Sequence, residues 1–231
     1  MNKQENFKRL FDSASAIIFD FDGVLAHSEK WHFLTYGEVF ARYGHTLDET
    51  EYYKYWTSLG HGARGEIERH GLDLDPIAIR EEKRPLFSER CEDGSIKLYP
   101  QAHEILERLE TTGKKITIAS GTASYDIDAI LRNAGVRDVF TDIIGCDTVP
   151  AIKPAPDLFL AMLERLGVNP RQCLVIEDAE KGVQAATTAG IPVIVIRNDE
   201  TRTFDFSAAD LTLDSHAEFL EMVRHAIPSE S

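Results

Sequence analysis

Short apolar segments with the residue types of β-strands alternate with segments of helical periodicity along most of this sequence. Most of the strand-like segments are apolar throughout, as expected of parallel strands that helices cover on both faces. Each helical segment between them reaches a glycine near its end, where helices commonly stop. This alternation predicts an α/β fold with a doubly wound parallel sheet, whose functional groups gather at the carboxyl ends of the strands. The expected strands are residues 16–21, 114–120, 173–178, 191–197 and a weaker one at 140–145.

Residues 27–95 interrupt this alternation, because they contain helical patterns and no convincing strand. Three helices are expected there, over about 29–44, 49–60 and 75–91. We therefore predict a core domain made of residues 1–26 and 96–231, and a small inserted α-helical cap domain at 27–95. The name "cap" is used below for residues 27–95, which two linkers would hinge over the strand ends.

The overall charge limits the partners of the protein. A formal net charge of -14 argues against binding to nucleic acid or to an anionic membrane surface, since both need an excess of Lys and Arg.

The first residues lack the apolar stretch of a secretory signal, and no segment approaches the ~18 apolar residues of a membrane span. Cys91, Cys146 and Cys173 are odd in number and widely separated, which favours reduced thiols. We expect a soluble cytoplasmic protein, present as a monomer or weak homodimer.

Four acidic residues fall at the ends of predicted strands: Asp20, Asp22, Glu177 and Asp178. A lone acid in such a place more often caps a helix or faces solvent. If these four converge, each pair of like charges about 5 Å apart costs about 3 kcal/mol at an effective dielectric of 20. A bound divalent cation removes this cost, and an all-oxygen site with few protein ligands suits Mg²⁺.

The same residue types suit phosphoryl transfer. A carboxylate such as Asp20 can attack a phosphate monoester in line and form an aspartyl phosphate, while Asp22 acts as the general acid and base. Ser120 and Gly121 lie where a hydroxyl and backbone N–H groups could meet phosphoryl oxygens near a helix start. Lys153 precedes a proline that restricts it to extended geometry, which would aim its ammonium group at the strand ends as a counter-charge.

Together these segments resemble the haloacid dehalogenase superfamily of aspartate-based phosphotransferases, in the branch with a helical cap inserted after the first strand. The matching segments are DFDGVL, IASGT, IKPAPD and IEDAEKGVQAA, in order from about 16 to 197. The resemblance implies that Asp20 is nucleophile and metal ligand, and that Asp22 is acid and base with its backbone carbonyl on Mg²⁺. Ser120 and Lys153 would hold the phosphoryl group. Asp178, with Glu177 nearby or acting through water, would complete the metal site.

Within that branch, LAHSEKWHFL and KPAPDLF look like the β-phosphoglucomutase group. His32 then lies on a cap helix ten residues beyond Asp22, and Arg64 falls where that group has a cap arginine that grips the distal sugar phosphate. Ala123 and Ser124, however, stand where the mutase supplies Lys and Asn to a phosphate. His32 and Arg64 are therefore the candidate substrate contacts of the cap.

Two other patterns fall within the cap. GHGARG (60–65) fits the dinucleotide fingerprint, but it follows a helical stretch rather than a strand, so we expect either a turn at the cap tip that contacts substrate or a plain helix connection. Arg80, Lys83 and Arg84 alternate with glutamates, which predicts a solvated helix face.

The sequence thus predicts a Mg²⁺-dependent phosphomonoester hydrolase that acts on a small phosphorylated metabolite, such as a sugar phosphate, through an aspartyl phosphate. A β-phosphoglucomutase-like sugar phosphomutase is the alternative. A phosphate-binding or signalling module without turnover is an alternative of another class, although a receiver domain has its phosphorylated Asp on the third strand and no cap.

Overall fold

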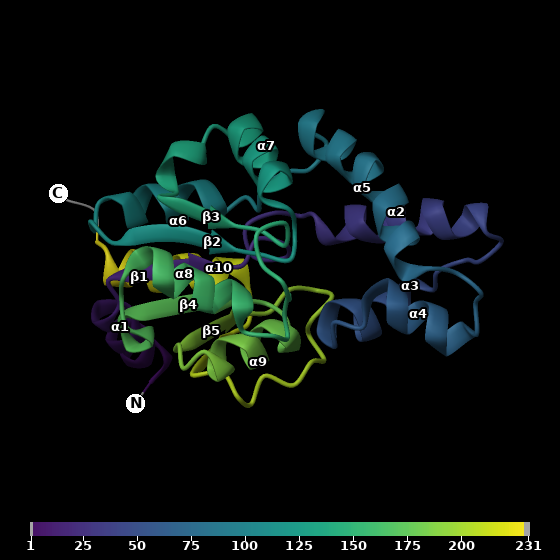
Figure 1. The fold of residues 1–231 in the computed structure, drawn as a ribbon. Helices are drawn as coiled ribbons and strands as arrows, with labels where there is room; N and C mark the ends of the chain where they lie inside the picture. The colour runs from purple at the N-terminus through teal and green to yellow at the C-terminus, as the bar shows by residue number, and fades with distance from the viewer. Residues whose placement is uncertain (1, 229–231) are drawn as a thin grey trace.

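A six-stranded parallel sheet lies at the centre of the structure, a computed structural model that describes residues 2–228 (Figure 1). Its strand order is β3-β2-β1-β4-β5-β6. The chain therefore runs to one side of β1 and then returns to the other, which confirms the predicted doubly wound α/β fold. The strands are β1 (Ala16–Phe19), β2 (Lys115–Ala119), β3 (Asp142–Ile144), β4 (Cys173–Glu177), β5 (Val193–Ile196) and β6 (Leu211–Leu213).

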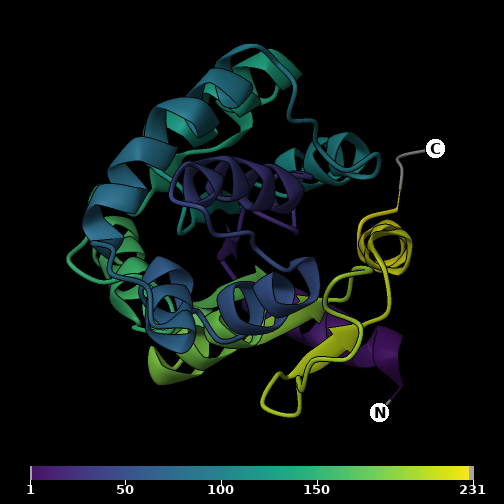
Figure 2. The ribbon, with the colours of Figure 1, turned by 90° about the vertical axis from the view of Figure 1, so that its right-hand side faces the viewer.

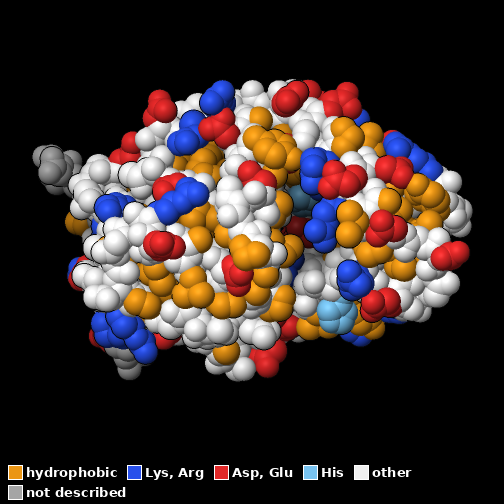
Figure 3. All heavy atoms as spheres, in the orientation of Figure 1, with side chains coloured by type: hydrophobic (Ala, Val, Ile, Leu, Met, Phe, Trp, Pro, Cys, Tyr) orange, Lys and Arg blue, Asp and Glu red, His pale blue; other side chains and the backbone are white. Residues whose placement is uncertain are grey.

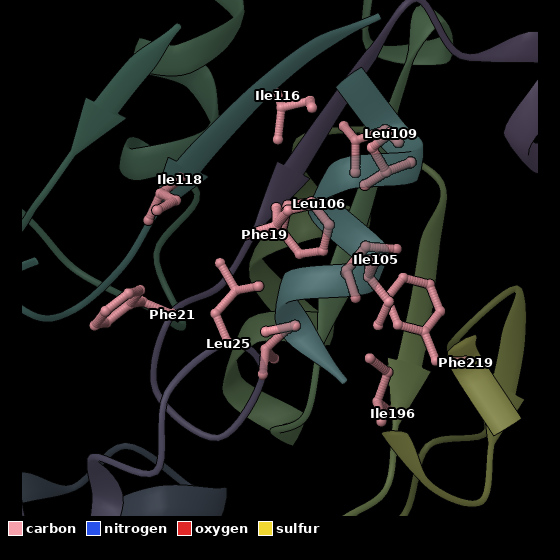
Figure 4. Close-up of a cluster of buried hydrophobic side chains, with 14 of the residues drawn as sticks. Phe19, Phe21, Leu25, Ile105, Leu106, Leu109, Ile116, Ile118, Ile196 and Phe219 are labelled. Carbon is pink, nitrogen blue, oxygen red and sulfur yellow. The ribbon is translucent and has the colours of Figure 1, made fainter. Parts of the chain in front are cut away.

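Helices cover both faces of the sheet, because alternate residues of each strand point to opposite sides. Ile17 and Phe19 belong to one buried cluster, whereas Ala16 and Ile18 belong to the other. Figure 4 shows Phe19 in the first cluster, close to Leu106 of α6. The helices of this first face are α1 (Lys3–Ser13), α6 (Ala102–Glu110), α7 (Ser124–Ala134) and α10 (His216–Ala226); those of the second are α8 (Asp157–Leu166) and α9 (Glu180–Thr188).

The cap is helical and has a small buried cluster of its own, which includes Phe40, Trp56 and Ile79. Figure 1 shows its helices grouped beside the core, and in Figure 2 they face the viewer. The two linkers run side by side, since Ala26 and Leu98 form an antiparallel bridge. The cap elements are α2 (Glu29–Arg42), α3 (Glu49–Glu51), a π-helix (Tyr52–Ser58), α4 (Gly62–His70) and α5 (Pro76–Glu92).

Several elements differ from the sequence-based expectations. The strand expected at 191–197 begins only at Val193, because Pro192 has no N–H to give to the ladder. The helix α4 begins within GHGARG, so that Gly60, with φ +74°, remains in the turn before it. The helices α1 and α10 and the short strand β6 were not predicted.

Within residues 2–228, no helix combines the length and the apolar character that a membrane crossing requires. Cys91, Cys146 and Cys173 are free.

Candidate active site

Three carboxylates meet at the carboxyl ends of β1 and β4. Asp20 follows β1, Glu177 is the last residue of β4, and Asp178 comes next. The two strands are hydrogen-bonded neighbours that pair Phe19 with Ile176, so the residue after each partner falls at the same level of the sheet. One oxygen from each carboxylate lies within 4.8 Å of the others, and all three side chains are buried.

The ammonium group of Lys153 lies among these carboxylates. Lys153, from the loop after β3, donates to Asp20 Oδ1 at 2.7 Å and lies 2.7 Å from Glu177 Oε1. Burial, and next the charge of Glu177, raise the pKa of Asp20 to about 7. The same two causes raise the pKa of Asp178. Three buried carboxylates against one ammonium leave an excess of negative charge, which a divalent cation would compensate.

Backbone and side-chain contacts fix the orientation of two of these acids. Glu177 Oε2 accepts hydrogen bonds from the N–H groups of Asp178 and Ala179, at 3.0 and 3.2 Å. Asn198 donates to Asp178 Oδ2 at 2.7 Å. A Cβ on Gly23 would lie 2.0 Å from the same Asp178 oxygen, so only glycine fits there. Asn198 was not predicted from the sequence, although its position just after β5, the neighbour of β4, was a usable signal.

Asp22 does not join the three-acid group, although all four acids were expected to converge. Its Oδ2 accepts from Ser120 Oγ at 3.0 Å and from Thr122 Oγ1 at 2.7 Å. Its Oδ1 accepts from Ser28 Oγ and lies 3.2 Å from His32 Nε2. Burial alone would raise the pKa of Asp22, but His32 and the hydroxyl donors more than offset it and hold that pKa well below its usual range. The resting carboxylate is therefore ionised.

Besides Ser28, the cap supplies two further groups near Asp22. His32, from α2, stacks on Phe87 with ring centroids 3.9 Å apart. Lys83, from α5, places its Nζ 2.7 Å from His32 Nδ1. Lys83, His32 and Asp22 thus form a continuous chain of polar contacts from the cap into the core.

Lys83 is 7% exposed, so the predicted solvated helix face was wrong for this residue. Ile79 and Phe87, four residues before and after it, are also buried, which places all three on one inward face of α5. That spacing was the signal that could have found it. Burial lowers the pKa of Lys83 to about 8. Arg80 and Arg84 are exposed, as predicted.

Polar contacts also join the cap to the second face of the core. Ser58 donates to Glu180 Oε2 at 2.7 Å, and Lys181 Nζ donates to the Trp56 carbonyl at 3.3 Å. Figure 3 shows a hollow between the core and the cap with Lys and Arg side chains at its rim. The cap is therefore docked over the strand ends.

The remaining predicted site residues lie outside these contacts. Arg64, on α4, is exposed and makes no hydrogen bond or ion pair with any residue of 2–228. Gly121 is exposed directly after Ser120. The structure therefore joins His32, but not Arg64, to the candidate active site.

Comparison with known proteins links this geometry to an enzyme family. The family model for haloacid dehalogenase-like hydrolases matches residues 17–196. The chain is 34% identical to protein CbbY of Rhodobacter capsulatus over 84% of this chain and 90% of that protein. It is 31% identical to the fructose-1-phosphate phosphatase YqaB of Escherichia coli, over 81% of this chain and 99% of the relative.

The fold is similar to that of a solved relative. A crystal structure of mutant CbbY from Rhodobacter sphaeroides, in complex with xylulose-(1,5)bisphosphate, superposes with a TM-score of 0.77. The sequence identity is 31%, and the match covers 89% of this chain and 96% of the other.

Proposed function

Because the chain belongs to the haloacid dehalogenase-like hydrolase family, we propose that it is a Mg²⁺-dependent phosphatase of a small sugar phosphate. The observation that carries the proposal is the group of three buried carboxylates around the Lys153 ammonium. Relatives named as a fructose-1-phosphate phosphatase and a CbbY bound to a sugar bisphosphate support the substrate class.

The donor set fits Mg²⁺, which prefers oxygen ligands and keeps part of its water. Asp20, Asp178 and Glu177 would hold the ion, with the Asp22 backbone carbonyl as a further oxygen. When bound, Mg²⁺ supplies positive charge that offsets the carboxylates and the phosphoryl oxygens. The charge excess described above supports this assignment.

Asp20 would act as the nucleophile. Its carboxylate oxygen forms a bond to phosphorus while the bond between phosphorus and the sugar oxygen breaks, which gives an aspartyl phosphate and a sugar alkoxide. Lys153, already paired with Asp20, would shift to the phosphoryl oxygens and neutralise part of their charge. Water then attacks phosphorus, releases inorganic phosphate and restores the Asp20 carboxylate.

The leaving oxygen needs a proton, which Asp22 must first receive because its own carboxyl is ionised at rest. His32 Nε2 lies against Asp22, and His32 Nδ1 lies against Lys83. We infer that a proton passes from Lys83 to His32 Nδ1 while His32 Nε2 gives its proton to Asp22. In the second half-reaction Asp22 takes the proton of the attacking water, and the same contacts return it.

Hydrolysis is favoured over isomerisation by the loop after β2. Ser124 donates from its backbone N and its Oγ to the carboxylate of Asp147, both at 2.7 Å. A fixed carboxylate here would repel the second phosphate of a bisphosphate intermediate, which a mutase must hold. A sugar phosphomutase is the second candidate, since the docked cap would limit access of water to the aspartyl phosphate.

The test is to incubate the protein with Mg²⁺ and a panel of hexose and pentose phosphates, and to measure phosphate release and isomer formation in the same samples. We expect phosphate release to be the faster reaction. Faster isomerisation would make the protein a mutase. If the protein neither releases phosphate, nor forms isomers, nor binds beryllofluoride, it would instead be a phosphate-binding or signalling module that catalyses no reaction.

A further inference from the structure

A second cluster of ionisable side chains lies within the cap and takes no part in the candidate active site. His45, from the loop after α2, places its Nε2 2.8 Å from Glu66 Oε1. His70 Nε2 lies 3.4 Å from the same oxygen. Glu66 and His70 are four residues apart on α4 and therefore share one face of that helix. One donor atom from each of the three residues lies within 4.8 Å of the others.

The second oxygen of Glu66 is held by other partners. Its Oε2 accepts from Trp56 Nε1 at 3.2 Å and pairs with the Arg69 guanidinium. Glu66 itself is 2% exposed. Metal-binding carboxylates are commonly oriented in this way, with one oxygen hydrogen-bonded and the other directed at the metal. The orientation of Glu66 Oε1 toward two imidazoles is therefore fixed from outside the three-residue group.

The distance between His70 and Glu66 fits a tetrahedral ion. Two donors that each lie about 2.1 Å from a zinc ion in tetrahedral geometry are about 3.4 Å apart. The His70–Glu66 distance has that value, and Glu51 Oε2 lies 3.2 Å from the same His70 nitrogen. The His45–Glu66 distance is shorter and would open slightly around an ion.

The charges also fit a dication. Glu66 and Glu51 carry two negative charges and Arg69 one positive charge, so two neutral imidazoles leave the cluster one charge negative. Imidazole nitrogens with a single carboxylate oxygen suit Zn²⁺ and related transition metals, whereas Mg²⁺ prefers an all-oxygen set. We propose that His45, Glu66 and His70 bind a transition-metal dication of the Zn²⁺ type, which ties the loop after α2 to α4.

The whole protein is first treated with a chelator to remove bound metal ions. It is then saturated with Mg²⁺, so that the strand-end carboxylates are occupied. Co²⁺ is titrated as a spectroscopic substitute for Zn²⁺, and its visible bands and affinity are measured; Zn²⁺ is then tested by its effect on the thermal unfolding midpoint. The variant is His70→Ala, since His70 is exposed and its truncation should leave the fold intact. The matched control is His103→Ala, an exposed histidine of α6.

We expect the wild type and the control to bind Co²⁺ with tetrahedral bands and to gain thermal stability from Zn²⁺. His70→Ala should lose the bands and weaken binding at least about tenfold. Asp20→Asn should keep them, which separates this site from the active site. Absence of Co²⁺ bands in the wild type, or equal binding by the wild type and His70→Ala, would show instead that these side chains form only an ion-pair network with Arg69.

Discussion

The core and the cap hold the same carboxylate, Asp22, in different ways. The core uses Ser120 and Thr122, short buried side chains that follow β2, the strand next to β1. The cap uses Ser28 just before α2, His32 on α2 and, behind it, Lys83 on α5. The core donors are fixed by the register of two paired strands, whereas the cap donors reach Asp22 only while the cap is docked.

The docking combines apolar packing, in which Phe87 and Cys91 of α5 join the core cluster, with polar contacts. Ser58 with Glu180, and Lys181 with the Trp56 carbonyl, are polar contacts of the kind that interdomain motions break and reform. We therefore expect the cap to open for the substrate and close before reaction. Substitutions in the core should abolish the chemistry itself, and substitutions in the cap should change proton supply and substrate selection.

The largest effect on activity is expected for a substitution in the core, Asp20→Asn. An amide cannot form the aspartyl phosphate, so kcat for phosphate release should fall by more than about 10⁴-fold. The binding of beryllofluoride, followed by ¹⁹F NMR, should disappear in parallel. Asp128→Asn, which alters an acid of α7 paired with Arg137, is the control and should retain both. Hydrolysis that survives Asp20→Asn would remove Asp20 as nucleophile.

The next largest effect is expected for Lys153→Met. Loss of the ammonium removes a phosphoryl contact, so kcat should fall by about 10²–10³-fold. Without metal, it also leaves the buried carboxylates of Asp20 and Glu177 without their ion-pair partner, and breaking such a pair costs about 3–5 kcal/mol of unfolding free energy. Urea unfolding in chelator should show that loss, and Mg²⁺ should restore most of it.

Lys30→Met, at an exposed position, is the matched control for Lys153→Met and should change neither quantity. Equal stability of the wild type and Lys153→Met in chelator would mean that Lys153 does not balance the strand-end carboxylates.

In the cap, Lys83→Met should lower kcat by about 10- to 100-fold, the lower part of the range for acid–base catalysis. Since burial lowers the pKa of Lys83 to about 8, the wild-type kcat should fall as pH rises above about 8, where Lys83 loses the proton that it passes on. That alkaline limb should vanish in Lys83→Met. His32→Gln should give a similar loss, and the double variant no more than either single one. If the decrease in kcat at high pH persists in Lys83→Met, then Lys83 does not supply the proton that reaches Asp22 through His32.

The stability of Lys83→Met should change in the opposite direction to its activity. The folded pKa of Lys83 lies below the ordinary value of 10.5, so the unfolded chain binds more protons between about pH 8 and 10.5. Stability of the wild type should therefore rise with pH through that window. At pH 7 the charged amine destabilises the fold, and Lys83→Met should add up to about 3 kcal/mol of unfolding free energy. A lower unfolding free energy would mean that the amine is better compensated than its burial implies.

The sequence predicted the site residues of the core better than those of the cap. Asp20, Glu177 and Asp178 were predicted to lie together because parallel strands bring their carboxyl ends to one edge, so position along the chain implies proximity in space. Asp22 shows the limit of that rule, since adjacency to Asp20 does not say which way its side chain points. Its orientation depends on Ser28 and His32, which lie just before α2 and on α2, at the start of the cap.

Within the cap no such rule exists. Lys83 was assigned to a solvated face by its charged neighbours, although its spacing from Ile79 and Phe87 placed it on the buried face. A buried lysine is visible in a sequence only if the apolar period is given more weight than local charge. The strand β6 was missed because three residues are too few to show a period.

The smallest effect is expected for Arg64→Ala. Arg64 is exposed on α4, so any contact with the distal end of a sugar phosphate would be an exposed ion pair worth less than about 1 kcal/mol. We expect KM to rise about two- to fivefold with kcat unchanged, because such a contact is equal in the ground and transition states. The control is Arg132→Ala, which alters an exposed side chain on α7 of the core domain and should leave KM unchanged. A KM that does not change in Arg64→Ala would remove Arg64 from the binding site, and His32 and Lys83 would then remain as the cap residues joined to the chemistry.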